Sequence, residues 1–122
     1  MLRTYKELVA WQKAFSLCTR VYAVTRAFPS DERFGLTSQI RRSAVSIPSN
    51  IAEGYGRGTT RDYVRFLWNA NGSLCELETQ LLLAKELAFG QVAELSHALD
   101  DLAEEERVLS ALIRSLEEKL TQ

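Results

Sequence analysis

The chain has 122 residues, of which 46% are hydrophobic and 25% are charged, and its net charge at pH 7 is −1. This composition is typical of one soluble globular domain, so we expect residues 1–122 to form a single unit and exclude wholesale disorder. The sequence has neither the roughly 18 consecutive apolar residues of a membrane span nor the apolar stretch of a signal peptide, so we expect a cytoplasmic protein.

The charge is unevenly distributed along the chain. Residues 1–65 have a net charge of +6, whereas residues 66–122 have a net charge of −7. This separation suits nucleic-acid binding by the basic half, and it equally suits salt bridges between the halves of one bundle or of neighbouring copies. The sequence leaves these interpretations open.

Hydrophobic periodicity predicts four helices and no strands. The expected helical ranges are about 6–28, 37–55, 60–88 and 91–119. Because short turns join long helices, we predict an all-α fold, an antiparallel up-down four-helix bundle.

The range 6–28 carries two adjacent apolar rows and ends before Pro29. Trp11 and Phe15 belong to one row, and Leu17 and Val21 belong to the other. The combined arc is wider than one seam requires, so we expect contacts on two sides of this helix. Cys18 and Cys75, which both fall on apolar faces, are expected to be reduced thiols in the core.

The range 37–55 contains Pro48, at which we predict a kink rather than an end of the helix. A stripe of polar and mostly small side chains runs beside its apolar row, which is unusual for a surface that faces water. We interpret the stripe as a structural feature or a subunit contact, whose covered members would need polar partners. The stripe consists of Gln39, Ser43, Ser46, Asn50 and Glu53.

A glycine-rich turn over residues 54–58 precedes the third range. Arg57, Arg61 and Arg65 lie four residues apart across this turn and the following helix. Freed backbone N–H groups and arginines suit an anion such as phosphate, although a flexible basic turn is the alternative. The candidate nucleic-acid-binding residues are Lys13, Arg20, Arg41, Arg42, Arg57, Arg61 and Arg65.

The last two ranges have regular apolar spacing, which Glu106 interrupts. We expect Glu106 to face solvent, and a buried carboxylate that fixes the register is the alternative. His97, the one histidine, is expected on a polar face, and the acidic cluster around it lacks the Glu-x-x-His pairs of a di-metal bundle. We therefore predict no enzyme activity, no metal site and no cofactor.

Five segments carry a family resemblance. They are LVAWQKA at 8–14, FP at 28–29, FGLTSQIRRSAVSIPSNIAEGYGR at 34–57, FL at 66–67 and GSLCELETQL at 72–81. Together they resemble the bacterial four-helix-bundle proteins of the 23S ribosomal RNA intervening-sequence type, over about residues 5–87. A relative of that family is the accessory protein of diversity-generating retroelements, which binds a reverse transcriptase and nucleic acid. The resemblance implies a homopentamer with no known enzymatic activity.

The function that we expect is binding. The first hypothesis is a self-assembling bundle that binds RNA or a nucleoprotein through its basic N-terminal half. The alternative is a protein-interaction adaptor, for example for a reverse transcriptase, without direct contact to nucleic acid.

Overall fold

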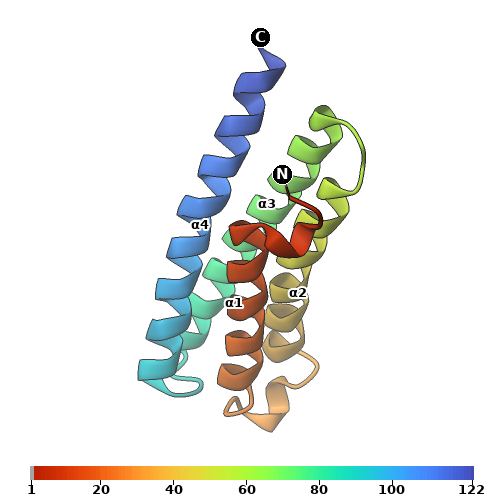
Figure 1. Cartoon of the computed structure of the whole chain (residues 1–122). Helices are drawn as coiled ribbons and strands as arrows, with labels where there is room; N and C mark the ends of the chain where they lie inside the picture. The colour runs from red at the N-terminus through yellow and green to blue at the C-terminus, as the bar shows by residue number, and fades with distance from the viewer. Residues whose placement is uncertain (1) are drawn as a thin grey trace.

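The computed structural model describes residues 2–122, and within them it contains four long helices and no strand (Figure 1). The fold predicted from the sequence, an all-α four-helix bundle, is confirmed. The elements are η1 (Tyr5–Glu7), α1 (Val9–Thr25), η2 (Ser30–Glu32), α2 (Leu36–Tyr55), α3 (Thr60–Glu86) and α4 (Val92–Leu120), where η marks a short 3-10 helix.

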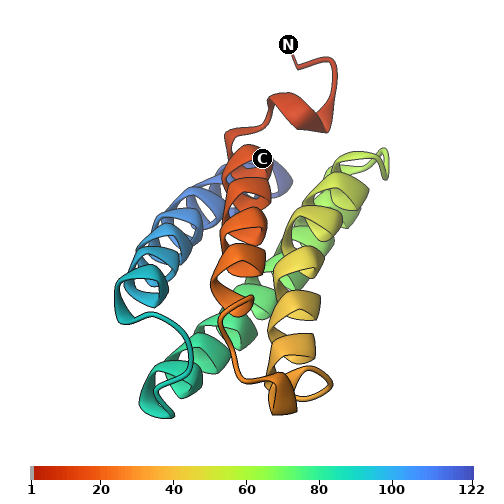
Figure 2. The ribbon, with the colours of Figure 1, turned by 90° about the horizontal axis from the view of Figure 1, so that it is seen from below.

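The four helices form a closed ring of neighbours. Each packs against the helix before and after it, and α1 also packs against α4, whereas the diagonal pairs are not in backbone contact within the described chain. The α1–α2 corner and the α3–α4 turn lie at one end of the bundle (Figures 1 and 2). The α2–α3 turn and both termini lie at the other end.

Both ends of α1 differ from the predicted range, whereas α2 continues through its proline as predicted. Leu8 has an extended backbone, with φ −71° and ψ 127°, so the first range is divided into η1 and an α1 that starts at Val9. α1 ends at Thr25, three residues before the predicted end at Phe28. Pro48 does not end α2, which continues through it to Tyr55.

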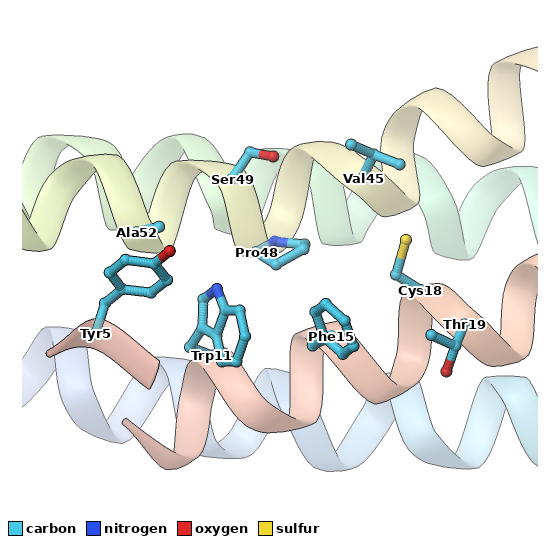
Figure 3. A pocket seen from close by; sticks show the side chains of 9 residues that line it. All are labelled: Tyr5, Trp11, Phe15, Cys18, Thr19, Val45, Pro48, Ser49 and Ala52. Atoms are coloured by element: carbon cyan, nitrogen blue, oxygen red, sulfur yellow. The ribbon is translucent and has the colours of Figure 1, made fainter. Parts of the chain in front are cut away.

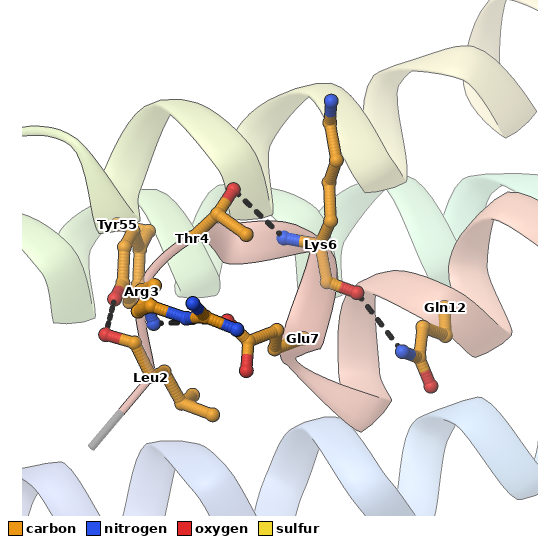
Figure 4. A network of polar contacts seen from close by, with 7 residues as sticks. All are labelled: Leu2, Arg3, Thr4, Lys6, Glu7, Gln12 and Tyr55. Carbon is orange, nitrogen blue, oxygen red and sulfur yellow. Dashed lines mark hydrogen bonds and ion pairs between the residues drawn. The ribbon is translucent and has the colours of Figure 1, made fainter.

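The segment before α1 is tied to the bundle by hydrogen bonds (Figure 4). The Tyr55 hydroxyl donates to the Leu2 carbonyl oxygen at 3.1 Å. The Gln12 amide donates to the Lys6 carbonyl oxygen at 2.9 Å. These bonds hold η1 across the end of α1 and next to the end of α2.

The two apolar rows of α1 have different roles. The row that contains Leu17 and Val21 is fully buried in the core. In the other row, Trp11 is half-buried and Phe15 is 51% exposed, so this row faces the outside of the bundle beside α2. The second apolar row, for which we predicted a contact on another side of the helix, lines a surface groove in the single chain.

The polar stripe of α2 faces α3 at its centre. Ser43 is buried and its hydroxyl donates to Glu76 at 3.1 Å. The Ser46 hydroxyl is 2.8 Å from the Ser73 hydroxyl, and Asn50 donates back to the Ser46 carbonyl oxygen at 2.8 Å. The ends of the stripe, Gln39 and Glu53, are exposed. Its central members thus join α2 to α3 within one chain, which supports the structural interpretation.

α4 contains two adjacent carboxylates with opposite environments. Glu106 is exposed, as predicted from the sequence. Its neighbour Glu105 is completely buried, and neither of its carboxylate oxygens has a hydrogen-bond partner within residues 2–122. The core therefore contains a carboxyl group that the sequence analysis did not identify.

Candidate nucleic-acid interface

The seven basic residues predicted to bind nucleic acid do not form one continuous surface. Lys13 and Arg20 lie on α1, next to α4. Arg41 and Arg42 lie in the first half of α2, near the α1–α2 corner, whereas the other three lie around the α2–α3 turn. Because a helix rises about 1.5 Å per residue, Arg42 lies about 20 Å along α2 from the helix end at Tyr55, where the turn begins. The structure thus divides the set into three groups.

The α1 group is paired with acidic residues of the same chain. The Lys13 ammonium lies 2.6 Å from Glu104, and the Arg20 guanidinium pairs with Asp101. The hydrogen bond from Lys13 and its positive charge lower the pKa of the Glu104 carboxyl. Of the possibilities left open by the charge distribution, salt bridging within one bundle therefore holds for these two residues.

The group at the α2–α3 turn is built around Phe66. The guanidinium carbons of Arg57 and Arg65 lie 4.9 and 4.6 Å from the centre of the Phe66 ring. Phe66 itself is only 8% exposed, so the two arginines cover the ring. Stacking of this kind orients a guanidinium before a ligand arrives, and its N–H edge remains able to donate two bonds to a phosphate.

Two carboxylates partly balance this arginine cluster. Glu53 approaches Arg57 at 4.0 Å, and Asp62 approaches Arg65 at 3.4 Å. Both arginine side chains are still about half exposed, at 45% and 56%. Arg61, one helical turn before Arg65, is exposed and has no ion-pair partner in the described chain. The cluster therefore keeps a net positive charge at its surface.

The α2 pair consists of one fixed and one exposed arginine. The Arg41 Nε–H donates to the Thr25 hydroxyl at 2.8 Å, and the guanidinium lies 4.6 Å from the centre of the Tyr22 ring. Arg42, its neighbour, is exposed. Neither residue forms an ion pair within residues 2–122.

A largely apolar groove of about 360 Å³ lies between α1 and α2 (Figure 3). Tyr5, Trp11 and Phe15 form one wall as a run of contacting rings, with centroids 5.3 and 5.0 Å apart. Pro48 and Val45 belong to the opposite wall, on α2. No charged side chain is among the described residues that line the groove, so it is poorly suited to bind an anion.

The two cysteines differ from the prediction of core thiols. Cys18 is half-buried and lines the groove, while Cys75 is exposed on α3, so that prediction is wrong for Cys75. Burial raises the pKa of the Cys18 thiol. A raised pKa leaves little thiolate at neutral pH, which makes Cys18 a weak nucleophile.

Three residues that the structure places in the candidate sites or in the core were not identified from the sequence. Phe66 was assigned no role in the site, and nothing in the local sequence indicates that its ring meets Arg57 of the preceding turn as well as Arg65. Arg33 adjoins Arg41 and Arg42 in a pocket at the α1–α2 corner. Glu105 could have been found from the spacing of Leu95, Ala98, Leu102 and Leu109, since steps of three and four from these positions reach it.

The geometry agrees with comparisons to known proteins. A protein of unknown function from the S23 ribosomal protein family of Bacteroides thetaiotaomicron has a crystal structure that superposes with a TM-score of 0.77. The two chains are 22% identical, and the match covers 86% of this chain and 98% of that one, which shows a common fold. Among curated proteins none matches. The family described as 23S rRNA-intervening sequence protein matches residues 6–111, so the chain belongs to this family.

Proposed function

We propose that the protein is a non-catalytic, self-assembling bundle that binds RNA or a nucleoprotein. The observation that supports RNA binding most directly is the arginine cluster at the α2–α3 turn. Arg57 and Arg65 are oriented by Phe66, and Arg61 stands exposed beside them. Lys13 and Arg20 are not part of the proposed interface, because α4 carboxylates already pair with them.

The absence of catalysis is part of the proposal. Cys18 lies in the apolar groove with a raised pKa, and His97 is exposed on α4. A nucleophile needs a base within hydrogen-bond reach, and the residues that line the groove include no such base. Cys18 and Cys75 are both free thiols, which fits the proposed cytoplasmic location. No helix in residues 2–122 is long and apolar enough to span a membrane.

Titration of a labelled single-stranded RNA, followed by fluorescence anisotropy at several salt concentrations, tests the proposal. Each phosphate contact contributes about 0.7 to the slope of log affinity against log salt for a single strand. We therefore expect the double variant Arg57→Ala/Arg61→Ala to bind more weakly to every sequence and with a flatter slope. Arg114→Ala is the matched control, because it removes an exposed arginine of α4 on the acidic half.

Absence of RNA binding at low salt would contradict the proposal. Electrostatic contacts are strongest at low salt, so a wild-type protein that binds no RNA at about 50 mM salt does not use this cluster for RNA. Recovery of the same protein partner at both low and high salt would then support the adaptor function instead. In that case the apolar groove, rather than the arginine cluster, would be the surface to mutate.

A further inference from the structure

A second basic site lies at the opposite end of the bundle from the arginine cluster. It is a pocket of about 510 Å³ at the α1–α2 corner, within the range of small-molecule sites. Arg33 enters it from the corner, and Arg41 and Arg42 enter it from α2. Figure 2 shows the corner that joins the two helices.

The charges in this pocket are uncompensated. No carboxylate belongs to the described residues that line it, and none of its three arginines forms an ion pair within residues 2–122. Of the eight other arginines in the chain, four form ion pairs within the described residues, whereas none of the three in this pocket does. Three guanidinium groups around one cavity create a positive potential that attracts an anion.

Arg41 is held in place before any ligand binds. Its Nε–H donates to the buried Thr25 hydroxyl at 2.8 Å, and one Nη2–H donates to the Tyr22 carbonyl oxygen at 3.4 Å. The Thr25 hydroxyl in turn donates to the Val21 carbonyl oxygen at 2.8 Å, so its own hydrogen bonds are complete. A guanidinium has five N–H donors, and three of those of Arg41 therefore remain for a ligand.

The pocket also presents an aromatic ring that packing in the fold does not explain. Phe34 is 85% exposed, the highest fraction among the exposed large hydrophobic residues. The Arg33 guanidinium lies 4.8 Å from its ring centre. An inorganic anion would use the arginines but would leave this ring in water, whereas an apolar ligand would leave the arginines without partners. A ligand that has both a phosphate and a flat ring satisfies both sets of groups.

We propose that this pocket binds a nucleotide. The phosphate lies against Arg41 and Arg42, and the base stacks on Phe34. The same chemistry belongs to a free nucleotide and to one unit of a single-stranded RNA. If the unit is part of an RNA, the pocket deepens the proposed function by adding a second contact about 20 Å along α2 from the turn that carries the arginine cluster.

Calorimetric titration of the wild-type protein tests the inference with four probes: adenosine monophosphate, adenosine, inorganic phosphate and a ten-nucleotide single-stranded RNA. We expect the monophosphate to bind at least about tenfold more tightly than either adenosine or phosphate, because it satisfies both halves of the pocket. The oligonucleotide and the monophosphate are compared on the Arg57→Ala/Arg61→Ala variant, which lacks the other RNA contact. Tighter binding of the oligonucleotide to this variant assigns the pocket to RNA, and the opposite order assigns it to a free nucleotide.

Two variants separate the two halves of the pocket. Arg42→Ala should weaken binding of the monophosphate and of phosphate by about tenfold. Phe34→Ala should weaken binding of the monophosphate by a similar factor while leaving phosphate unchanged. Both side chains are exposed, so the thermal melts of the variants should match that of the wild type.

The controls make failure of this inference distinguishable from failure of the proposed function. Arg57→Ala/Arg61→Ala, at the other end of the bundle, should keep full affinity for the monophosphate even where it loses RNA binding. A monophosphate that binds no more tightly than phosphate, or an affinity that Phe34→Ala leaves unchanged, would overturn the nucleotide pocket.

Discussion

Glu105 occupies a position of α4 that an apolar side chain would normally fill. It is fully buried, and both carboxylate oxygens lack a hydrogen-bond partner in the part of the chain that the structure describes. Burial, with a smaller contribution from Glu104, raises the pKa of its carboxyl group to about 8, against the lowering effect of Lys13. An isolated charge in a core costs several kcal/mol, so the group stays protonated at neutral pH.

The first prediction is a pH-dependent stability that depends on this residue. Between the ordinary pKa of 4.5 and about 8, the folded chain holds a proton that the unfolded chain has released. The contribution of Glu105 to the free energy of unfolding therefore falls as pH rises through this window, by up to about 1.4 kcal/mol per unit. Below 4.5 and above 8 it is constant, so the loss is complete by about pH 8.

Glu105→Leu removes both the proton and the buried polar atoms. We expect the stability of this variant relative to the wild type to rise by up to about 3–4 kcal/mol between pH 5 and pH 8, because only the wild type loses the contribution of the buried proton. Urea unfolding at pH 5, 6, 7 and 8 measures the difference, and groups that titrate in both proteins cancel. Glu105→Gln keeps the shape and should also flatten the profile. Parallel profiles for all three proteins would show that Glu105 does not titrate in this range.

The packing of α2 on α3 depends on small side chains. Gly54 is buried at the end of α2, where an added Cβ would lie 2.7 Å from the Phe66 Cβ and 3.2 Å from the Tyr63 carbonyl oxygen. Backbone atoms and Cβ atoms cannot move away as the end of a long side chain can, so the two helices would have to separate. The same separation would disturb Phe66, on which the arginines stack.

The second prediction compares two glycines of this helix pair. Gly54→Ala should destabilise the protein by about 1–3 kcal/mol, because it overpacks the contact. Gly72→Ala is the matched control in the interior of α3, where an added Cβ meets no atom within 4 Å. That change should stabilise the protein by about 0.5–1 kcal/mol, since alanine favours the helix. Thermal melts of both variants with the same sign of shift would contradict this account of the contact.

The elements were predictable from the sequence to a greater extent than the site. Regular three- and four-residue spacing indicates a helix whatever surrounds it, which is why α3 and α4 were expected close to their observed ranges. The break at Leu8 was not visible, because nothing in its side chain excludes a helix. Nor did the spacing distinguish the buried row of α1 from the row beside the groove, since both rows are apolar and the choice depends on where α2 packs.

The site depends on tertiary contacts that have no local signal. A list of basic residues does not show that Lys13 and Arg20 are paired across the bundle with α4, or that Arg42 is not paired. Likewise, Arg33, Phe34 and Arg41 meet only because the α1–α2 corner folds back on α2. The sequence therefore supported the hypothesis that basic residues bind an anionic partner. The structure was needed to divide these basic residues into separate groups.

At the scale of the whole molecule, the charge separation is partly used within the chain. The Lys13–Glu104 and Arg20–Asp101 pairs join the basic and acidic halves through α1 and α4. Because these pairs use part of the charge within one chain, the charge separation supports salt bridges between neighbouring copies less strongly than the sequence alone suggested. The apolar surfaces are the stronger reason to expect assembly, because Phe15 beside α2 and Trp68 beside α4 are about half exposed, at 51% and 50%.

Phe15 and Trp68 lie on different faces of the four-helix bundle. Phe15 lines the α1–α2 groove, whereas the Trp68 indole donates to Glu117 of α4 and so lies on the α3–α4 side. Two different faces that bind one another give a heterologous contact, which closes into a ring when the rotation permits. A single self-complementary face would instead give a two-fold dimer. The homopentamer suggested by the family resemblance requires the first arrangement.

The last prediction concerns this assembly and uses one substitution on each face. Light scattering of the wild type at micromolar concentration should give the mass of an oligomer, a pentamer in our proposal. Phe15→Glu and Trp68→Glu each place a charge in one of the two faces, so each variant alone should be a monomer. When they are mixed, each retains the face that the other has lost, and the expected product is a dimer of one copy of each. If the wild type and Trp68→Glu both have the mass of a dimer while Phe15→Glu is a monomer, the groove binds a second groove and a ring is excluded. A wild type that is monomeric at every salt concentration would remove self-assembly from the proposal and leave the groove for a different protein.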